Sequence, residues 1–198
     1  MVTESVRGGG AILVNQEGKR FTDEMGTRDV VSAAEIAQPG GYAYLIFDQA
    51  QREGLSAIES YVKNGLTTEA DTLDTLAEAI NVDPATLADT VATWNEAVAA
   101  KDDTAFGRST GMDVDISQAP FYAIQIAPGI HHTMGGVKIN DKSEVLDTEG
   151  SVIAGLYAAG EVTGGVHGGN RIGGNAVADI VIFGRIAGQQ AAEYVANK

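Results

Sequence analysis

The stretch GLYAAGEVTGGVHGGNRIGGNA, from Gly155 to Ala176, decides the fold of this chain. It begins as a short apolar strand over Leu156–Ala159 and continues through a loop crowded with glycine and polar residues. It then leads into an apolar segment that predicts a long helix from Asn175 to about Ala196. A loop between the carboxyl end of a strand and the N-terminus of a helix suits anions and close ligand approach. We therefore expect a ligand site here; the alternative is a long glycine loop that holds no ligand.

Charge separates this tail from the rest of the chain. The 198 residues carry 27 acidic and 13 basic side chains, for a net charge of −14. Residues 1–154 hold 24 of the acids and 10 of the bases, whereas residues 155–198 hold three of each. Glycine is unusually frequent, at 25 of 198 residues, or about 13% against a typical ~7%. The body is thus predicted to be solvated, and the neutral, glycine-rich tail to pack closely against another domain or a cofactor.

The composition excludes several classes of function. A hydrophobic share of 44% with 20% charged residues is typical of a folded globular chain. The acidic balance argues against nucleic acid as a partner, because it cannot neutralise a phosphate backbone. The absence of cysteine excludes disulfides and thiolate ligands, and no histidine has metal-ligand spacing, so we expect no metal site. The apolar run Ile180–Phe183 is too short for a membrane span, and no signal peptide is expected in the first thirty residues.

Hydrophobic period and turn residues predict the other elements. Strands are expected over Ala11–Val14, Tyr42–Phe47 and Phe121–Ala127, and a three-stranded meander over Val137–Ile139, Val145–Leu146 and Val152–Ile153. Helices are expected over Val30–Gln38 and from the Asp83-Pro84 start to Ala100. The second of these helices carries one apolar stripe, made of Leu87, Val91, Trp94 and Val98. The C-terminal helix carries a smooth face suited to close packing, made of Gly184, Gly188 and Ala192.

Longer motifs occur in a fixed order along the whole chain. They are Met1-Val2-Thr3-Glu4, Glu17-Gly18-Lys19-Arg20-Phe21, Thr27-Arg28-Asp29, His131-His132-Thr133-Met134-Gly135-Gly136 and the quoted stretch from Gly155 to Ala176. In order and spacing these motifs resemble the flavin-dependent fumarate reductase/succinate dehydrogenase family, and most of all its soluble flavocytochrome c type. Gly169, where the family pattern has alanine, and Val177, where isoleucine is frequent, are small departures near backbone contacts.

The resemblance implies an α+β fold in two parts. Residues 1–130 correspond to most of a capping (clamp) domain, and residues 131–198 to the C-terminal segment of a Rossmann-like FAD-binding domain. The chain resembles about the C-terminal half of such an enzyme. It has no G-x-G-x-x-G turn after a strand and no haem domain, so its FAD site is incomplete without the missing N-terminal half. We therefore expect the chain alone to be inactive. The resemblance also implies that the full-length parent protein, of which this chain would be a part, is an electron-transferring flavoprotein of anaerobic respiration in the periplasm or cell envelope.

The resemblance also assigns roles to individual residues. The implied reaction is FAD-dependent reduction of fumarate to succinate, with hydride from flavin N5 and a proton from Arg28, which Glu4 and Arg7 resupply. The residues implied to bind the substrate are Thr3, Glu4, His131, Arg171 and Gly174, and those implied to contact FAD are His132, Glu161, Ala176 and Val177. A guanidinium grips a carboxylate with two hydrogen bonds, which suits the arginine to its role.

Two of these positions also have simpler, non-catalytic interpretations. Arg28 alternatively forms a surface ion pair with Asp29 or Glu24, and Glu161 is alternatively a carboxylate at a helix end or in a loop. His167, in the same loop as Glu161, is expected to make a structural hydrogen bond.

Two other functions stand beside fumarate reduction. One is an isolated, non-catalytic capping-domain fragment. The other is a flavin-dependent reductase of a different unsaturated acid, such as urocanate or methacrylate. The set of Thr3, His131 and Arg171 favours a C4-dicarboxylate, because each acid group then has a partner. The sequence does not indicate the electron donor.

Overall fold

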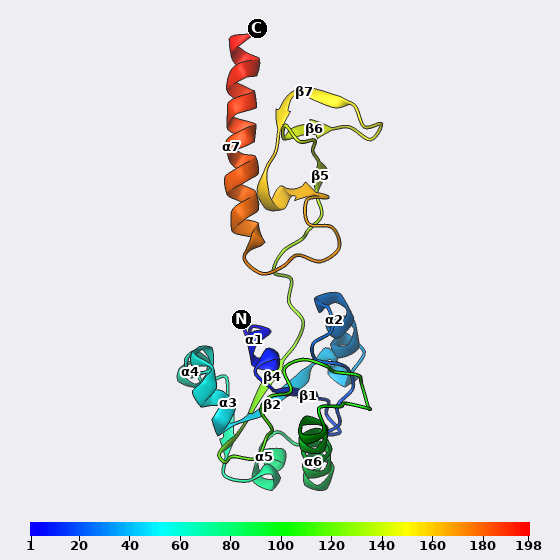
Figure 1. Ribbon diagram of the computed structural model, residues 1–198, viewed down its shortest axis with the longest axis vertical. Helices are drawn as coiled ribbons and strands as arrows, with labels where there is room; N and C mark the ends of the chain where they lie inside the picture. Colours follow the sequence, from blue (N-terminus) through cyan, green and yellow to red (C-terminus); the bar gives the residue numbers. More distant parts are fainter. The chain divides into compact units, whose positions relative to one another are not determined.

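The chain divides into two units, Met1–Pro128 and Gly129–Lys198, in the computed structural model, which describes residues 1–198 (Figure 1). Helices and strands are mixed in both units, as an α+β chain requires. The predicted division after residue 130 lies close to this boundary. That the units correspond to a capping domain and a FAD-domain segment stays a prediction.

A four-stranded antiparallel sheet forms the centre of the first unit. Its strands lie in the order β1 (Ile12–Val14), β2 (Ala43–Asp48), β4 (Phe121–Ile126) and β3 (Thr68–Ala70). All six residues of β2 pair with β4, and residues 44–46 also pair with β1, so that Leu45 lies opposite both Leu13 and Ile124. The strands predicted over residues 11–14, 42–47 and 121–127 are confirmed to within one or two residues at each end.

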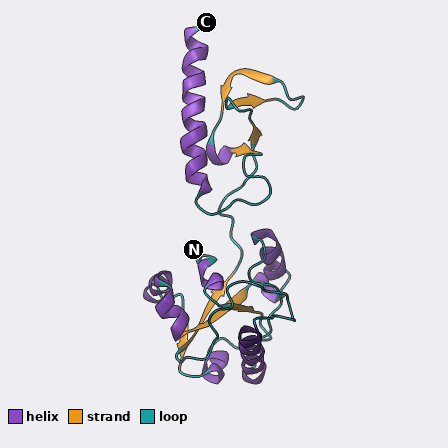
Figure 2. Ribbon diagram, in the orientation of Figure 1, coloured by secondary structure: helices purple, strands orange, loops and turns teal.

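Helices cover both faces of this sheet (Figure 2). They are α1 (Ser5–Gly8), α2 (Arg28–Ile36), α3 (Gln49–Gly54), α4 (Ser56–Lys63), α5 (Leu73–Ala79) and α6 (Pro84–Ala100), with a short 3₁₀ turn η1 at Pro39–Gly41. Because successive side chains of a strand point to opposite faces, β1 serves two cores. Ile12 and Val14 pack with α5 and α6, while Leu13 packs with residues of α1, α2 and α4.

Local signals explain where two of these helices begin. Asp83 caps α6 by accepting a hydrogen bond from the Thr86 N–H at 2.9 Å, and the predicted apolar stripe of α6 is buried, as expected. Helix α2, predicted from Val30, begins two residues earlier because Thr27 has the extended backbone of a residue that precedes a helix. Arg28 is therefore the first residue of α2.

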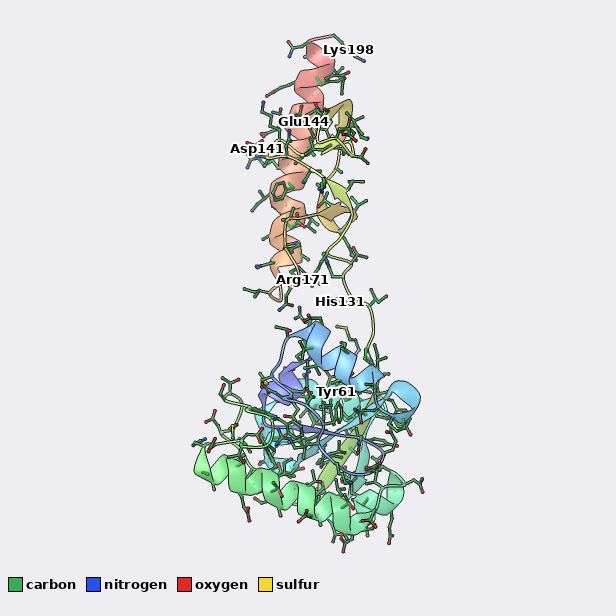
Figure 3. All side chains as sticks on the ribbon, turned by 90° about the vertical axis from the view of Figure 1, so that its right-hand side faces the viewer. Tyr61, His131, Asp141, Glu144, Arg171 and Lys198 are labelled. Atoms are coloured by element: carbon green, nitrogen blue, oxygen red, sulfur yellow. The ribbon has the colours of Figure 1, made fainter.

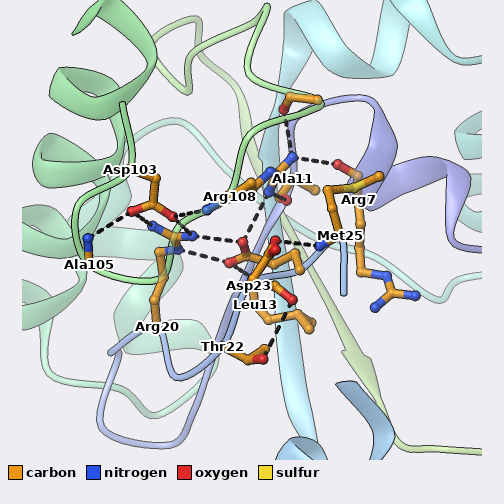
Figure 4. Close-up of polar contacts among 12 residues, drawn as sticks. Arg7, Ala11, Leu13, Arg20, Thr22, Asp23, Met25, Asp103, Ala105 and Arg108 are labelled. Carbon is orange, nitrogen blue, oxygen red and sulfur yellow. Dashed lines mark hydrogen bonds and ion pairs between the residues drawn. The ribbon is translucent and has the colours of Figure 1, made fainter. Parts of the chain in front are cut away.

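A cluster of four charged side chains lies buried beside the sheet (Figure 4). Arg20 Nη2 contacts Glu24 Oε2 at 2.8 Å and Asp103 Oδ2 at 2.9 Å, and Arg108 Nη1 contacts Glu24 Oε2 at 3.1 Å. The side chains of Glu24 and Arg108 are fully enclosed. Both guanidiniums lie over the Trp94 ring, 4.7 and 4.4 Å from its centroid. We call these four charged residues the buried charge network.

The two arginines of the network respond differently to burial. Burial acts to lower the pKa of Arg20, but its hydrogen bonds to Glu24 and Asp103 outweigh that effect and raise the pKa. Burial dominates at Arg108 and lowers its pKa, although the charge of Glu24 opposes the change. Arg108 offsets its desolvation by donating to four main-chain carbonyls, those of Arg7, Ala11, Thr110 and Gly111.

The second unit contains two small sheets and one long helix. Strands β5 (Val137–Lys138) and β8 (Thr163–Gly164) pair in parallel, and β6 (Glu144–Leu146) and β7 (Val152–Tyr157) form an antiparallel hairpin. The helices are a 3₁₀ turn η2 (Gly160–Val162) and α7 (Asn175–Ala196), whose predicted bounds are confirmed.

Two expectations about the second unit need correction. The meander was expected to contain three consecutive strands, but only β6 and β7 form a hairpin, because β5 pairs with the later β8. The segments predicted as two strands around Gly155 form the single strand β7, since glycine allows the chain to continue there with φ at 79°.

Helix α7 packs within its unit against β7 and η2. The small-residue face predicted for close packing has no neighbour there, because a Cβ added at Gly184 or Gly188 meets nothing within 4 Å. Several large apolar residues of α7 are exposed, among them Val177, Ile180, Val181 and Ile182. No helix, α7 included, combines the length and apolar character that crossing a bilayer requires.

We predict that Arg108→Met lowers the free energy of unfolding of the 198-residue chain by about 3–5 kcal/mol. The substitution preserves apolar volume but removes one of the two guanidinium partners of Glu24 and takes this donor away from four carbonyls. Chemical denaturation followed by far-ultraviolet circular dichroism measures the change. The matched control is Glu17→Gln, which removes an exposed ion pair with Lys19 and is expected to cost about 1 kcal/mol or less. An Arg108→Met loss no larger than that of the control would contradict the prediction.

Candidate active site

An ion pair joins the first two helices of the first unit. Glu4 stands at the start of α1, and its Oε1 accepts a hydrogen bond from Nε of Arg28 at the start of α2. Both side chains are a little under half exposed. The hydrogen bond from Arg28 lowers the pKa of Glu4, and the nearby charge of Arg7 adds to the effect. The structure thus brings together the three residues predicted to move the proton.

The ion pair expected as the simpler role of Arg28 forms with a different acid from those predicted. Its acidic partner in the first unit is Glu4 and not Asp29 or Glu24. Glu24 is fully engaged in the buried charge network, and Asp29 accepts a hydrogen bond from the Thr27 side chain. The pair is partly exposed, so both the ion-pair role and the proton-donor role of Arg28 stay predictions.

Thr3 is fixed by a residue that the sequence analysis missed. The Tyr61 hydroxyl accepts from the Thr3 N–H at 3.1 Å and lies 3.3 Å from its Oγ1. Tyr61 lies on the buried face of α4, inside the first unit (Figure 3). Its spacing from Ile58 indicates only a core position, so no signal in the sequence marks its hydroxyl as a partner of Thr3.

In the second unit, the predicted flavin contacts are linked to one another. The Thr133 N–H donates to Glu161 Oε1 at 3.1 Å, and the Thr133 hydroxyl donates to the Glu161 carbonyl at 3.2 Å. These bonds fasten the segment that follows His132 to η2. The two chain segments approach so closely that a Cβ at Gly136 would lie 1.9 Å from the Val162 carbonyl oxygen. Glycine is therefore required at that position.

A second contact holds the glycine loop to α7. His167 Nε2 lies 3.0 Å from Asp179 Oδ2, and Asp179 is buried in the first part of α7. The His167 ring also meets the His132 ring edge to face, with 5.5 Å between centroids. The structural hydrogen bond predicted for His167 is confirmed, and Asp179 is its unpredicted partner.

The remaining predicted residues surround the start of α7. Figure 3 shows His131 and Arg171 at the end of the second unit where α7 begins. Arg171 is buried, and its Nη1 donates to the Ile172 carbonyl at 3.2 Å. Gly174 precedes α7 in the left-handed conformation, with φ at 85°. The site residues thus form two sets: Thr3, Glu4, Arg7 and Arg28 in the first unit, and His131, His132, Glu161, Arg171, Gly174, Ala176 and Val177 in the second.

The start of α7 fits a large ligand that carries hydrogen-bond acceptors. No side chain caps this helix, so the Ala176 N–H in its first turn suits an acceptor from outside the helix, whereas the Val177 N–H already donates to the Gly174 carbonyl at 3.0 Å. Five glycines of the preceding loop face open space, since a Cβ added at any of them meets nothing within 4 Å: Gly165, Gly168, Gly169, Gly173 and Gly174. No group of three or more His, Asp or Glu side chains forms a metal site.

Comparison with known proteins identifies the family. Residues 1–177 match the family described as FAD binding domain. The chain belongs to this family. It is 54% identical over 193 residues to the NADH:fumarate oxidoreductase of Klebsiella pneumoniae (strain 342), a match covering 98% of this chain and 21% of that protein. It is 53% identical over 194 residues to the fumarate reductase (cytochrome) of Shewanella frigidimarina, covering 98% of this chain and 34% of that protein.

A solved structure supports the same conclusion. The open conformation of a flavocytochrome c3 fumarate reductase matches this FAD-binding-family chain with a TM-score of 0.79 and 49% sequence identity, over 98% of this chain and 34% of that one. The α+β fold and the resemblance to flavocytochrome c fumarate reductases are therefore confirmed. The chain spans about a fifth to a third of the length of these relatives.

Other relatives carry the names of other reactions. The NADH:acrylate oxidoreductase of Vibrio harveyi is 47% identical over 93% of this chain and 19% of its own length. The urocanate reductase of Eggerthella lenta is 35% identical over 92% of this chain and 31% of its own length. Family membership alone therefore does not select the acceptor.

We predict that Asp179→Ala, in the full-length protein that contains this chain, speeds amide hydrogen exchange across the loop 165–174. Loss of the bond to His167 should favour opening of the loop by about 1 kcal/mol, which corresponds to roughly fivefold faster exchange. Mass spectrometry of peptides from the loop measures the rates. Glu193→Ala, near the other end of α7, is the control and should leave them unchanged. Equal rates in both variants would show that the His167–Asp179 contact does not hold the loop.

Proposed function

We propose that the full-length protein containing this chain is an FAD-dependent oxidoreductase that reduces fumarate to succinate. The observation that carries the proposal is the Arg28–Glu4 pair, with Arg7 beside it. It supplies a positioned proton donor in a chain 53–54% identical to proteins named as fumarate reductases. The periplasmic or cell-envelope location is likewise a proposal.

The second unit supplies residues suited to hold FAD. The uncapped start of α7 offers the N–H group of Ala176, which Val177 follows in the same turn, while His132 and Glu161 belong to segments already tied together beside it. Bound FAD supplies the hydride that adds to one alkene carbon of the substrate. The N-terminal part of the full-length protein would complete the site, since this chain has no strand–glycine-turn–helix unit for the pyrophosphate.

Arg171, His131 and the Gly174 N–H are proposed to hold one substrate carboxylate. Thr3, whose hydroxyl is fixed by Tyr61, is proposed to contact the other carboxylate together with Glu4. Hydrogen bonds from a guanidinium and an imidazole draw negative charge toward the carboxylate oxygens. The double bond becomes poorer in electrons as a result, so the alkene carbon remote from this carboxylate becomes more electrophilic.

Arg28 is proposed to place the proton on the other alkene carbon. An arginine has an ordinary pKa above 12, so its proton leaves only toward a strongly basic centre and must be replaced quickly. Glu4 accepts a hydrogen bond from Arg28 and stands beside Arg7, which makes it the natural carrier of the replacement proton. The three members of the proposed relay thus alternate in charge, from arginine to glutamate to arginine.

A C4-dicarboxylate is favoured over acrylate, methacrylate and urocanate. Thr3 and Arg171 would offer a partner to each of two carboxylates, and each of the three alternatives carries only one acid group. The names of relatives at 54% and 53% identity indicate NADH and a cytochrome, respectively, as partners in electron supply. The electron donor is therefore proposed to be set by parts of the protein outside this chain.

We predict that Arg28→Ala nearly abolishes fumarate reduction by the full-length protein, and that Arg28→Lys does the same, while FAD stays bound. Lysine keeps a positive charge but lacks the planar geometry that bonds Glu4 through Nε. Steady-state turnover with a chemical reductant, together with the flavin absorbance, measures both effects. If either variant keeps more than about a tenth of kcat, a loss below about 1.4 kcal/mol of barrier, Arg28 is not the proton donor.

We predict that Arg171→Ala raises KM for fumarate and lowers kcat together. The guanidinium would both orient the carboxylate and polarise the double bond, so its loss should affect binding and the chemical step. Initial rates over a range of fumarate concentrations separate the two constants. The exposed Arg185→Ala on α7 serves as the control and should leave both constants unchanged. A change in KM alone would mean that Arg171 binds the substrate without polarising it.

A further inference from the structure

The hydroxyl of Thr3 meets two other hydroxyl groups of the first unit. Its Oγ1 lies 3.3 Å from the Tyr61 hydroxyl oxygen and 2.6 Å from Ser5 Oγ. Tyr61 approaches from α4 and is only 6% exposed, whereas Ser5 is the first residue of α1 and is exposed. The direction of the hydrogen bonds among these three groups decides what kind of ligand Thr3 can bind.

The main chain of Thr3 is bonded to two buried residues. Its N–H donates to the Tyr61 hydroxyl at 3.1 Å, and its carbonyl accepts from the Val6 N–H at 3.4 Å. Val6 and Tyr61 are buried in the same core cluster. The core of the first unit therefore sets the place from which the Thr3 side chain extends, directly before Glu4 in the chain.

The surroundings of Tyr61 favour it as the donor in its bond with the Thr3 hydroxyl. The Tyr61 oxygen already accepts the Thr3 N–H, and Thr3 is the only residue with which this hydroxyl forms a hydrogen bond. A tyrosine hydroxyl has one hydrogen to donate, and a phenol donates more strongly than an aliphatic alcohol does. The hydrogen of Tyr61 is therefore directed to Thr3 Oγ1, where it occupies one of the two lone pairs.

We propose that Tyr61 is a positioning residue that makes the Thr3 hydroxyl a hydrogen-bond donor to the second carboxylate of the substrate. This inference rests on the proposed function, which places a carboxylate against Thr3. With one lone pair of Oγ1 occupied by Tyr61, the Thr3 hydrogen turns toward the substrate. Ser5, 2.6 Å away, then donates to the other lone pair. Hydrogen bonds in such a chain polarise one another, which strengthens the bond to the carboxylate.

This chain of hydroxyls favours an anionic acceptor. An ionised carboxylate can only accept hydrogen bonds, and a hydroxyl with both lone pairs occupied can only donate, so the two groups are complementary. A methyl group in the same place would displace water from the Thr3 hydroxyl without replacing its hydrogen bond. Tyr61 contacts no substrate in this scheme; it acts through Thr3 on the choice between acids with two carboxylates and acids with one.

Tyr61→Phe in the full-length protein tests the proposal, because phenylalanine keeps the buried ring and removes only the hydroxyl. We expect KM for fumarate to rise about fivefold, with kcat changed by less than about twofold. The inhibition constant of succinate should rise by a similar factor. That of butyrate, which has the same carbon chain but one acid group, should stay the same. The control is Tyr44→Phe, which removes a hydroxyl bonded to the Ile80 carbonyl in the other core cluster and should change none of these constants.

A double-mutant cycle with Thr3→Val separates an effect through Thr3 from a general disturbance of the site. Valine keeps the branched shape of threonine without its hydroxyl, so Tyr61→Phe should raise KM by less than about twofold in that background. Ser5→Ala is a second variant, at an exposed position, that decides the question even if Tyr61→Phe fails to fold. It removes the other donor to Thr3 Oγ1 and should raise KM for fumarate about twofold to threefold.

Three results would overturn the role of Tyr61. They are an unchanged KM in Tyr61→Phe or in Ser5→Ala, equal rises in the inhibition constants of succinate and butyrate, and an equal effect of Tyr61→Phe with and without the Thr3 hydroxyl. If Arg28→Ala abolishes fumarate reduction while Tyr61→Phe changes nothing, the role of Tyr61 alone fails. If the unaltered protein does not reduce fumarate, the proposed function fails and this inference with it.

Discussion

The fold of the first unit depends on a buried group of opposite charges that neutralise one another inside its core. Two guanidiniums and two carboxylates meet where the strand β1, the segment 20–24 and the loop after α6 come together. Glu24 Oε1 also accepts the Leu13 N–H at 3.1 Å, so the network is bonded directly to the sheet. Charges removed from water are stable only if each has partners, so the segments that carry them must adopt one arrangement together. The network therefore specifies where these three parts of the chain meet.

That arrangement extends to the candidate active site through the main chain. Arg108 binds the carbonyls of Arg7 and Gly111, which fastens α1 to the loop that follows α6. Helix α1 has only four residues and would not be stable alone. Glu4 and Arg7 thus owe their positions to a guanidinium about a hundred residues away in sequence, and α2 adds Arg28 by packing Val31 in the same core as α1.

Sequence reasoning succeeded where the signal is local. Helix α6 has an acidic cap, a proline and an apolar stripe, and α7 begins directly after a glycine-rich loop, so both were predicted to within a residue. The buried charge network was not predicted, because Arg108 and Glu24 lie 84 positions apart and a buried arginine looks like a surface one in sequence. Of the site, the residues within family motifs were predicted by resemblance. Tyr61 was missed because its spacing from Ile58 marks it only as part of a buried face.

The position of Trp94 has a practical consequence. It is the only tryptophan of the chain, and it lies in the core of the first unit beneath two guanidiniums, whereas the second unit contains Tyr157, Phe183 and Tyr194. Intrinsic fluorescence excited near the red edge of protein absorption therefore reports on one unit alone, without a label. The first unit can accordingly be followed by itself during heating or ligand addition, and comparison with the circular dichroism of the whole chain would reveal whether the two units respond as one body or in turn.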